Sequence, residues 1–175
     1  ALLLDPVSPA LRVVNASILV ESGGIAQAVT EFEAALQLRA DGPRKLNLAQ
    51  LDLAQAGTLV ENGQQAAADA QFSEANRIVD EVIETWPRYG HAHLMRATIY
   101  MGLGDPERAR LELELAESLS PDTATLWAVW AQYHLAQSEP TTAAAKMRRA
   151  LVLDPNNWQL RLQAAQVFQA AGDDE

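Results

Sequence analysis

The chain has 175 residues, of which 49% are apolar and only 6% aromatic, and its formal net charge is -10 at pH 7. Because alanine and leucine dominate, the composition favours helix over strand. The negative charge disfavours nucleic acid as a partner, since binding to a phosphate backbone needs clustered lysine and arginine. We therefore expect an all-α protein, built as one domain or one repeat array, that does not bind nucleic acid.

Further classes are excluded by what the sequence lacks. There is no cysteine, so a disulfide, a thiolate metal site and a cysteine nucleophile are ruled out, while cytoplasm and periplasm both stay open as compartments. No stretch approaches the roughly 18 consecutive apolar residues of a membrane span, and the first residues lack the charged and apolar regions that are typical of a signal peptide. The one dense basic run, Lys146, Arg148 and Arg149, is typical of the solvated face of a helix.

The chain opens on "LLLDPVSPA", Leu2 to Ala10, which nearly repeats "LVLDPNNWQ" at Leu151 to Gln159. Both phrases read as the last turn of a helix that a proline ends. The first phrase therefore predicts the end of a helix whose beginning is missing.

The next two helix pairs are predicted around glycine turns. Gly23, Gly63 and Gly104 lie 40 and 41 residues apart, which is 6 and 7 more than the period of 34 that follows. In an antiparallel pair, lengthening the first helix at its start and the second at its end keeps the two matched. We therefore expect Arg44 to Glu61 and Gln64 to Trp86 to form one elongated hairpin.

The second half of the chain has a strict period. Pro87, Pro121 and Pro155 lie 34 residues apart, and each follows an apolar helical pattern. A proline does not continue a helix, so each of the three predicts a helix end.

A second signal divides each period into two helices. In "GLGDPERAR", Gly104 ends one helix, Asp105 can cap the next, and Pro106 suits its first turn. Pro140 stands 34 residues after Pro106. Each period is thus predicted to be a pair of antiparallel helices joined by a short turn.

This pattern resembles the tetratricopeptide repeat family, a 34-residue helix–turn–helix with large and small residues at set places. The small residues, expected where helices cross closely, are Ala97, Ala109, Ala116, Ala131, Ala143 and Ala150. The other matching residues are Tyr100, Gly104, Leu113, Pro121, Trp127, Met147 and Pro155, with His134 at the place of Tyr100. An earlier block matches more loosely through Ala16, Leu19, Gly23, Ala28, Phe32 and Ala35, with Ala40 at the place of the proline.

The resemblance implies a right-handed α-solenoid of antiparallel helix pairs, with about four and a half repeats. From Trp158 the chain gives one more first helix, with Ala165, Phe168 and Gly172 in register. Neither end carries a polar capping helix, so we expect a fragment of a longer array whose uncovered ends are a candidate surface for self-association. The predicted divisions of this single array are 1–7, 8–42, 43–89, 90–123, 124–157 and 158–175.

The phrase "LELEL", Leu111 to Leu115, alternates like a strand, but its context favours a helix. In a helix, Arg108 with Glu112 and Arg110 with Glu114 are predicted as ion pairs four residues apart.

Residue types that carry chemistry do not form a site. His91 and His93 are separated by about 200° of rotation on a helix, so we expect no shared metal. His134 is interpreted as a packing residue at an aromatic position. The stretch "ESGGIAQA", Glu21 to Ala28, lacks the preceding strand, lysine and hydroxyl residue of a phosphate loop. We predict no enzyme activity, no metal and no cofactor.

In the family that the chain resembles, the first helices of stacked pairs line a concave groove, which is the usual binding surface. Carrying over the groove positions gives an apolar and neutral-polar lining: Val13, Ser17, Val20, Leu53, Val60, His91, Leu94, Thr98, Met101, Thr125, Ala128, Gln132, Leu135, Leu162 and Gln166.

That lining bears on the kind of partner. Chaperone-adaptor members of the family grip an acidic C-terminal peptide with lysine, arginine and asparagine. In this sequence the corresponding places hold Leu94, Thr98, Ala128 and Val129. The resemblance therefore favours an apolar helix or extended peptide of a partner protein over an acidic tail.

Two functions stay open. The first is a non-catalytic scaffold for protein–protein interaction that binds a partner peptide or helix in the concave groove. The second is a docking or regulatory arm of a larger multidomain protein, such as an enzyme or an envelope polysaccharide-export factor. Packing against neighbouring helices is the alternative explanation for some of the groove residues.

Overall fold

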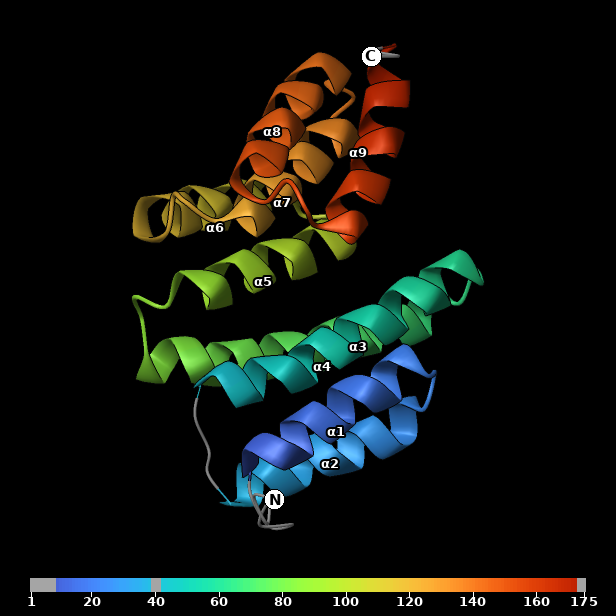
Figure 1. Cartoon of the computed structure of the whole chain (residues 1–175), viewed down its shortest axis with the longest axis vertical. Coiled ribbons are helices and arrows are strands. Elements are labelled where there is room, and N and C mark those ends of the chain that lie inside the picture. The colour runs from blue at the N-terminus through green and yellow to red at the C-terminus, as the bar shows by residue number, and fades with distance from the viewer. Residues whose placement is uncertain (1–8, 39–41, 173–175) are drawn as a thin grey trace. The chain divides into compact units, whose positions relative to one another are not determined.

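The computed structural model describes residues 9–38 and 42–172, and every regular element in this part of the chain is an α-helix. The prediction of an all-α fold is therefore confirmed. The chain divides into two compact units, Ala1–Pro87 and Arg88–Glu175, whose helices are labelled in Figure 1. The predicted helical turn at Leu2 to Pro6 and the register position Ala40 lie outside the described residues.

The first unit consists of two helix pairs. In the first pair, α1 (Pro9–Glu21) packs along α2 (Ile25–Leu38). In the second, α3 (Gly42–Glu61) packs along α4 (Gln65–Thr85), and these two long antiparallel helices agree with the hairpin that the glycine spacing predicts. The helices α2 and α3 are also in contact, so the two pairs stack on one another.

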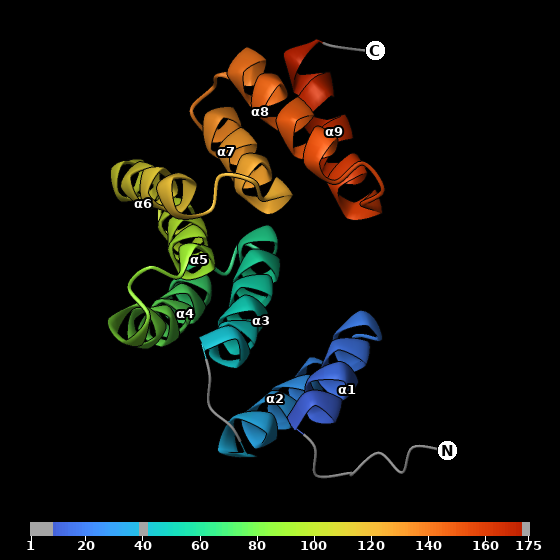
Figure 2. The same cartoon turned by 60° about the vertical axis from the view of Figure 1, so that its left-hand side comes forward.

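The second unit consists of two pairs and one further helix. These are α5 (Gly90–Gly102) with α6 (Pro106–Leu119), and α7 (Ala124–Ala136) with α8 (Pro140–Leu153), followed by α9 (Trp158–Ala171). The helix α7 contacts all four others, and Figure 2 shows α7, α8 and α9 side by side. Because α7 is surrounded in this way, its residues from Leu126 to Ala131 are all buried.

Small residues lie where the helices of the second unit pack together. The six alanines that the family pattern singles out are each at most 2% exposed; they are Ala97, Ala109, Ala116, Ala131, Ala143 and Ala150. A side chain of one carbon lets two helix backbones approach closely, and a larger one would force them apart. Their burial is what a close crossing predicts.

The ends of the helices follow the predicted signals. The helices α4, α6 and α8 each end two residues before a proline of the 34-residue series. Asp105 caps α6, because its carboxylate accepts a hydrogen bond from the backbone N–H of Arg108 at 3.0 Å. The loop that follows α6 is tied to the core, since the buried Trp127 donates its indole N–H to the carbonyl oxygen of Pro121 at 2.8 Å.

A residue in the left-handed region stands at the turn inside each of the four pairs. Three are the glycines Gly23, Gly63 and Gly104, with φ of 82°, 72° and 73°, and the fourth is Ser138, with φ of 61°. After Gly104 a backbone bond of 2.8 Å runs from Asp105 to Tyr100, and its counterpart after Ser138 measures 2.9 Å. The same turn therefore occurs twice in the second unit, once with Gly104 and once with Ser138. The left-handed conformation is unfavourable for a residue with a side chain such as Ser138.

Glu112 lies in a partly buried ionic cluster, so its predicted pairing with Arg108 is wrong. One carboxylate oxygen of Glu112 lies 2.8 Å from Nδ1 of His93, and the other accepts a hydrogen bond from Arg96 at 2.6 Å. The side chain of Glu112 is 15% exposed and that of His93 only 3%. Glu112 shares the helix face of Ala109 and Ala116, which turns it toward α5 and away from Arg108.

The other charged pairs of α6 lie at the surface. Arg108 binds the carboxylate of Asp105 instead of Glu112, because that carboxylate already caps the helix end one turn away. The predicted pair of Arg110 with Glu114 is confirmed, and it is exposed.

Exchanging the turn residues is expected to change stability in opposite directions. Ser138→Gly relieves the left-handed strain of a side chain and should stabilise the protein by about 0.5–1 kcal/mol, after allowance for the extra chain entropy of glycine. Gly104→Ser should destabilise it by about 1 kcal/mol, although an added Cβ there meets nothing within 4 Å. Urea unfolding followed by circular dichroism measures both, and a destabilised Ser138→Gly variant would contradict the strain argument.

The two carboxylates Glu112 and Glu114 provide a matched pair for the ionic cluster. Glu112→Ala removes the carboxylate that Arg96 and His93 share and is expected to cost about 2–4 kcal/mol of unfolding free energy. Glu114→Ala removes an exposed pair and should cost about 0.3–0.5 kcal/mol. Equal losses in the same urea titration would show that the cluster contributes no more than a surface ion pair.

Candidate partner-binding surface

The first helices of the pairs in the second unit lie next to one another. Direct contacts join α5 to α7 and α7 to α9. The predicted groove positions on α5 and on α7 are spaced three and four residues apart, so each set occupies one face of its helix. We call the surface that α5, α7 and α9 present with these positions the first-helix face.

A pocket of about 250 Å³ lies where the starts of α5 and α7 meet the end of α6. It brings together three of the predicted groove residues, His91, Leu94 and Thr125. The remaining lining residues, which the sequence analysis did not single out as groove residues, are Tyr89, Gly90, Ala116, Ser120, Thr123 and Leu126. We call this the α5–α7 pocket, and its lining contains no lysine, arginine, aspartate or glutamate.

The polar groups of the α5–α7 pocket are neutral. Desolvation by the surrounding protein lowers the pKa of the His91 imidazole below its ordinary value of 6.5, although the residue as a whole is exposed. The imidazole is therefore uncharged at neutral pH. Ser120 and Thr125 add hydroxyl groups, and the hydroxyl of Thr123 donates to the carbonyl oxygen of Ser120 at 3.2 Å. These groups can donate and accept hydrogen bonds without neutralising a charge.

Gly90 lies where the start of α5 comes close to the end of α6. A Cβ atom at this position would lie 2.7 Å from Oγ of Ser120, which can rotate away, and 3.2 and 3.3 Å from the Cβ atoms of Ser120 and Leu119. Because the last two distances are shorter than ordinary van der Waals contact, a side chain at position 90 would require the end of α6 to shift slightly.

The predicted groove residues of the second unit differ in how much of them a partner can reach. Leu94 and Ala128 are each 5% exposed and pack in the core, so for these two packing is the main role. Half-buried positions are Thr98, Met101, Gln132 and Leu135. The exposed positions are His91, Thr125, Leu162 and Gln166.

The predicted groove residues of the first unit do not line the α5–α7 pocket, nor a pocket among α2, α3 and α4. Val13 and Val20 pack against the small core of Ala16 and Phe32. Ser17 is exposed, and its hydroxyl donates to the carbonyl oxygen of Val13 at 3.0 Å. The last two positions are the half-buried Leu53 and the exposed Val60.

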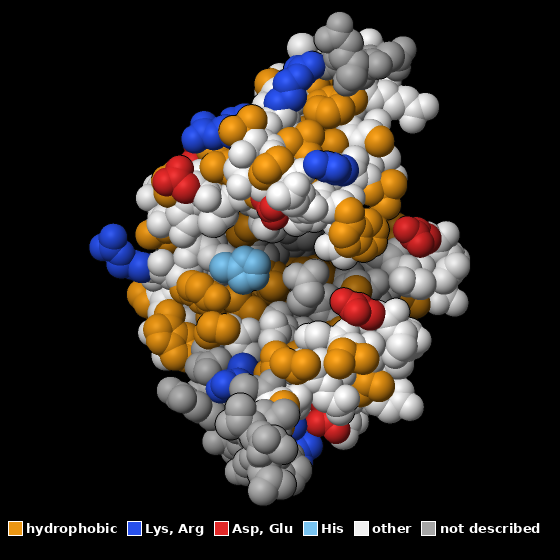
Figure 3. All heavy atoms as spheres, viewed as in Figure 1, with side chains coloured by type: hydrophobic (Ala, Val, Ile, Leu, Met, Phe, Trp, Pro, Cys, Tyr) orange, Lys and Arg blue, Asp and Glu red, His pale blue; other side chains and the backbone are white. Residues whose placement is uncertain are grey.

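Apolar side chains reach the surface over α8 and α9 (Figure 3). On α9, Trp158 is 69% exposed and Leu162, one turn later, is 61% exposed. Leu162 is one of the predicted groove residues, whereas Trp158 was predicted only as the start of the helix. The spacing of four residues between two large apolar side chains was the available signal.

His134, which was predicted to be a packing residue, and the basic run from Lys146 to Arg149, which was predicted to be solvated, contact aromatic rings. His134 stacks on Trp130, with ring centroids 5.5 Å apart, and is partly buried, which confirms its packing role. Arg149 lies 3.7 Å from the centroid of the Trp127 ring and Lys146 4.8 Å from it. The cations of this run therefore cover aromatic surface as well as facing solvent.

The two histidines of the "HAH" motif lie in different surroundings, as their helical separation predicts. His91 lines the α5–α7 pocket, whereas His93 is buried beside Glu112. Within the described residues, no group of three histidine, aspartate or glutamate side chains could hold a metal ion. In the same part of the chain, no helix combines the length and the apolar character that crossing a membrane requires.

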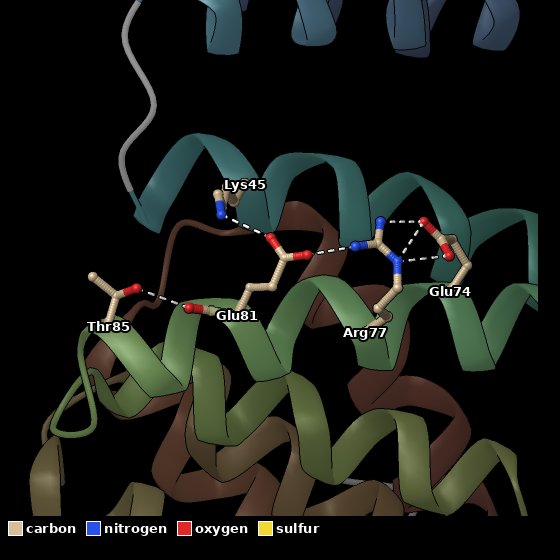
Figure 4. Close-up of polar contacts among 5 residues, drawn as sticks. All are labelled: Lys45, Glu74, Arg77, Glu81 and Thr85. Atoms are coloured by element: carbon tan, nitrogen blue, oxygen red, sulfur yellow. Dashed lines mark hydrogen bonds and ion pairs between the residues drawn. The ribbon is translucent and has the colours of Figure 1, made fainter.

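The first unit holds a charged pocket that sequence reasoning missed. It lies among α2, α3 and α4 and has a volume of about 270 Å³. Figure 4 shows its ion pairs: Lys45 contacts Glu81 at 2.8 Å, and Arg77 contacts Glu74 at 2.6 Å and also Glu81. We call this the α2–α4 pocket. Its residues come from three helices and no short motif links them.

Comparison with known proteins supports the assignment of the fold. The sequence profile of the tetratricopeptide repeat family matches residues 60–124, and no curated protein matches the chain in sequence. The crystal structure of a thermophilic tetratricopeptide repeat protein from Thermus thermophilus is similar, with a TM-score of 0.59 and 22% identity over 93% of this chain and 100% of that one.

Two further solved structures are similar to most of the chain. A tetratricopeptide repeat protein from Parabacteroides merdae has a TM-score of 0.52 and 18% identity over 92% of this chain and 71% of that one. PilF of Pseudomonas aeruginosa has a TM-score of 0.55 and 16% identity over 94% of this chain and 69% of that one. The resemblance is thus confirmed: residues 60–124 match the profile of the tetratricopeptide repeat family, and the fold is similar to that of solved tetratricopeptide repeat proteins.

Proposed function

We propose that the protein is a non-catalytic scaffold that binds an uncharged, apolar segment of a partner protein on the first-helix face. The observation that carries the proposal is the α5–α7 pocket, where three predicted groove residues meet without a charged neighbour in the lining. An acidic partner peptide would lose water in this pocket without gaining a cationic group in return. A partner side chain that is apolar loses nothing by entering it.

The size of the pocket fits a single anchoring side chain. Its volume of about 250 Å³ is below the usual range of sites that hold a drug-sized ligand. We therefore propose that one leucine- or phenylalanine-sized residue of the partner enters the α5–α7 pocket. The half-buried residues Met101, Gln132 and Leu135 then contact the neighbouring residues of the partner, with hydrogen bonds from the Gln132 amide.

Thr125 is the best position at which to test this proposal. Leu94 and Ala128 are 5% exposed, so changing them would disturb packing as well as binding. Thr125 is exposed, lines the pocket and is the second residue of α7. Thr141 is the matched control position, because it is exposed and is the second residue of α8, outside the pocket.

Thr125→Arg is expected to weaken binding of an apolar peptide by about tenfold or more, because it places an unpaired cation in the pocket beside two helix N-termini. Thr141→Arg carries the same change in charge and helix position and should leave the affinity unchanged. Peptides on the order of ten residues long are selected from a displayed random library, and the uncharged ones among them serve as ligands. Fluorescence anisotropy then gives the dissociation constants.

Hydrogen exchange on the same complexes provides the second readout. The bound peptide should protect the backbone around residues 89–94 and 123–128. Selection of mainly acidic peptides, or equal affinities of the two variants, would contradict the proposal. A thermal melt of each variant shows whether both are folded.

A further inference from the structure

The α2–α4 pocket of the first unit carries more acidic than basic side chains. Its charged lining consists of the cations Lys45 and Arg77 and the carboxylates Glu33, Asp52, Glu74 and Glu81. The two cations are already occupied, since Lys45 pairs with Glu81 and Arg77 pairs with both Glu74 and Glu81. Two negative charges are therefore left over in the pocket.

The carboxylates that remain are Glu33 on α2 and Asp52 on α3. Within the described part of the chain, neither forms an ion pair or a side-chain hydrogen bond, although both line the same pocket. They come from two different helices that are in contact. A positive group placed in the pocket would thus meet carboxylates on two sides.

The rest of the lining is apolar. Val29, Leu48 and Ile78 contribute one residue from each of the three helices, and Ile78 is only 8% exposed. An arginine or lysine side chain has this same composition, with an apolar stem below a charged head. The pocket volume of about 270 Å³ again lies below that of a drug-sized ligand site and suits one long side chain.

We propose that the α2–α4 pocket is a second docking site, which receives an arginine side chain of a peptide partner between Asp52 and Glu33. The guanidinium head can donate to both carboxylates, and its stem packs on Val29, Leu48 and Ile78. This site lies within the first unit and does not depend on the α5–α7 pocket. The two pockets are expected to bind different side chains, because the lining of the α5–α7 pocket is uncharged whereas the α2–α4 pocket has two unpaired negative charges.

The electrostatics of Asp52 agree with a carboxylate that has no cation paired with it. Burial, and secondarily the neighbouring charge of Glu74, raises the pKa of Asp52 from its ordinary value of 3.8 to about 6, while Arg77 partly opposes the shift. A bound guanidinium would favour the carboxylate form and lower this pKa again. Binding should therefore be strongest near neutral pH and weaken as the pH falls through about 6.

The test uses two small probes that differ only in charge. N-acetyl-arginine amide is titrated into the isotope-labelled protein near neutral pH, with N-acetyl-citrulline amide as the neutral analogue of the same shape. Amide chemical shifts are followed by NMR. We expect the arginine probe to shift amides around residues 29–33, 48–52 and 74–81 and the citrulline probe to leave them unchanged.

Asp52→Asn and Glu84→Gln form the matched pair of variants. Both remove one negative charge, but Glu84 is an exposed residue of α4 outside the pocket. Asp52→Asn should weaken binding of the arginine probe by at least about tenfold, and Glu84→Gln should leave it unchanged. Equal effects of the two variants would overturn the proposal in favour of diffuse attraction to an acidic protein. Equal binding of the citrulline probe would overturn it by showing that the charge of the guanidinium plays no part.

Loss of folding does not complicate this test. The protonated form of Asp52 is favoured in the folded state, so its contribution to stability is present below pH 3.8 and is lost as the pH rises through about 6. Near neutral pH, Asp52→Asn should therefore melt a few degrees higher than the original protein, with allowance for the partial exposure of the site. A variant that is more stable and yet does not bind locates the effect in the pocket.

Discussion

The close approach of helices at buried alanines is the constraint on which the rest of the second unit depends. Ala97 and Ala131 are at most 2% exposed, as are Ala109 and Ala116 of α6 and Ala143 and Ala150 of α8, so the backbones meet there with almost no side chain between them. This spacing allows α7 to be surrounded by α5, α6, α8 and α9. It also brings the starts of α5 and α7 to the end of α6, which creates the α5–α7 pocket. The binding surface is thus a consequence of the packing.

The α5–α7 pocket and the α2–α4 pocket differ because they form from different parts of the helix pairs. The α5–α7 pocket lies at helix ends, where turn residues such as Ser120 and Thr123 supply hydroxyl groups. The α2–α4 pocket lies along helix sides, where the solvated residues of long helices supply charges such as Asp52 and Arg77. One repeat architecture therefore offers an uncharged site and an acidic site, each within a separate compact unit.

The sequence predicted the fold well because its signals are local. A proline ends a helix through its own ring, and a left-handed turn favours glycine through its own backbone, so the bounds of α5 to α9 follow from neighbouring residues. Ser138 shows the limit of that reasoning, since the surrounding helices hold it in the turn geometry that glycine adopts elsewhere. Tertiary packing decides such a position.

The candidate sites were predicted only in part, because side-chain partners are set by contacts between helices. His91, Leu94 and Thr125 were selected from the repeat register and meet in one pocket, but the register did not indicate that Leu94 is buried. Glu112 was assigned to the wrong partner, because spacing along one helix does not reveal the basic residues of the neighbouring helix. The α2–α4 pocket has no signal in the sequence at all, since its residues are scattered over three helices.

The central claim is that an apolar anchor of the partner enters the α5–α7 pocket, and photo-crosslinking tests it most directly. A selected peptide carries benzoylphenylalanine in place of its apolar anchor, is bound to the protein and irradiated, and the attachment sites are located by mass spectrometry. We predict attachment at residues 89–94 and 123–126, with loss of the adduct when unlabelled peptide competes. Attachment mainly on the outer surface of α8 and α9, around Val152 and Trp158, would contradict the account.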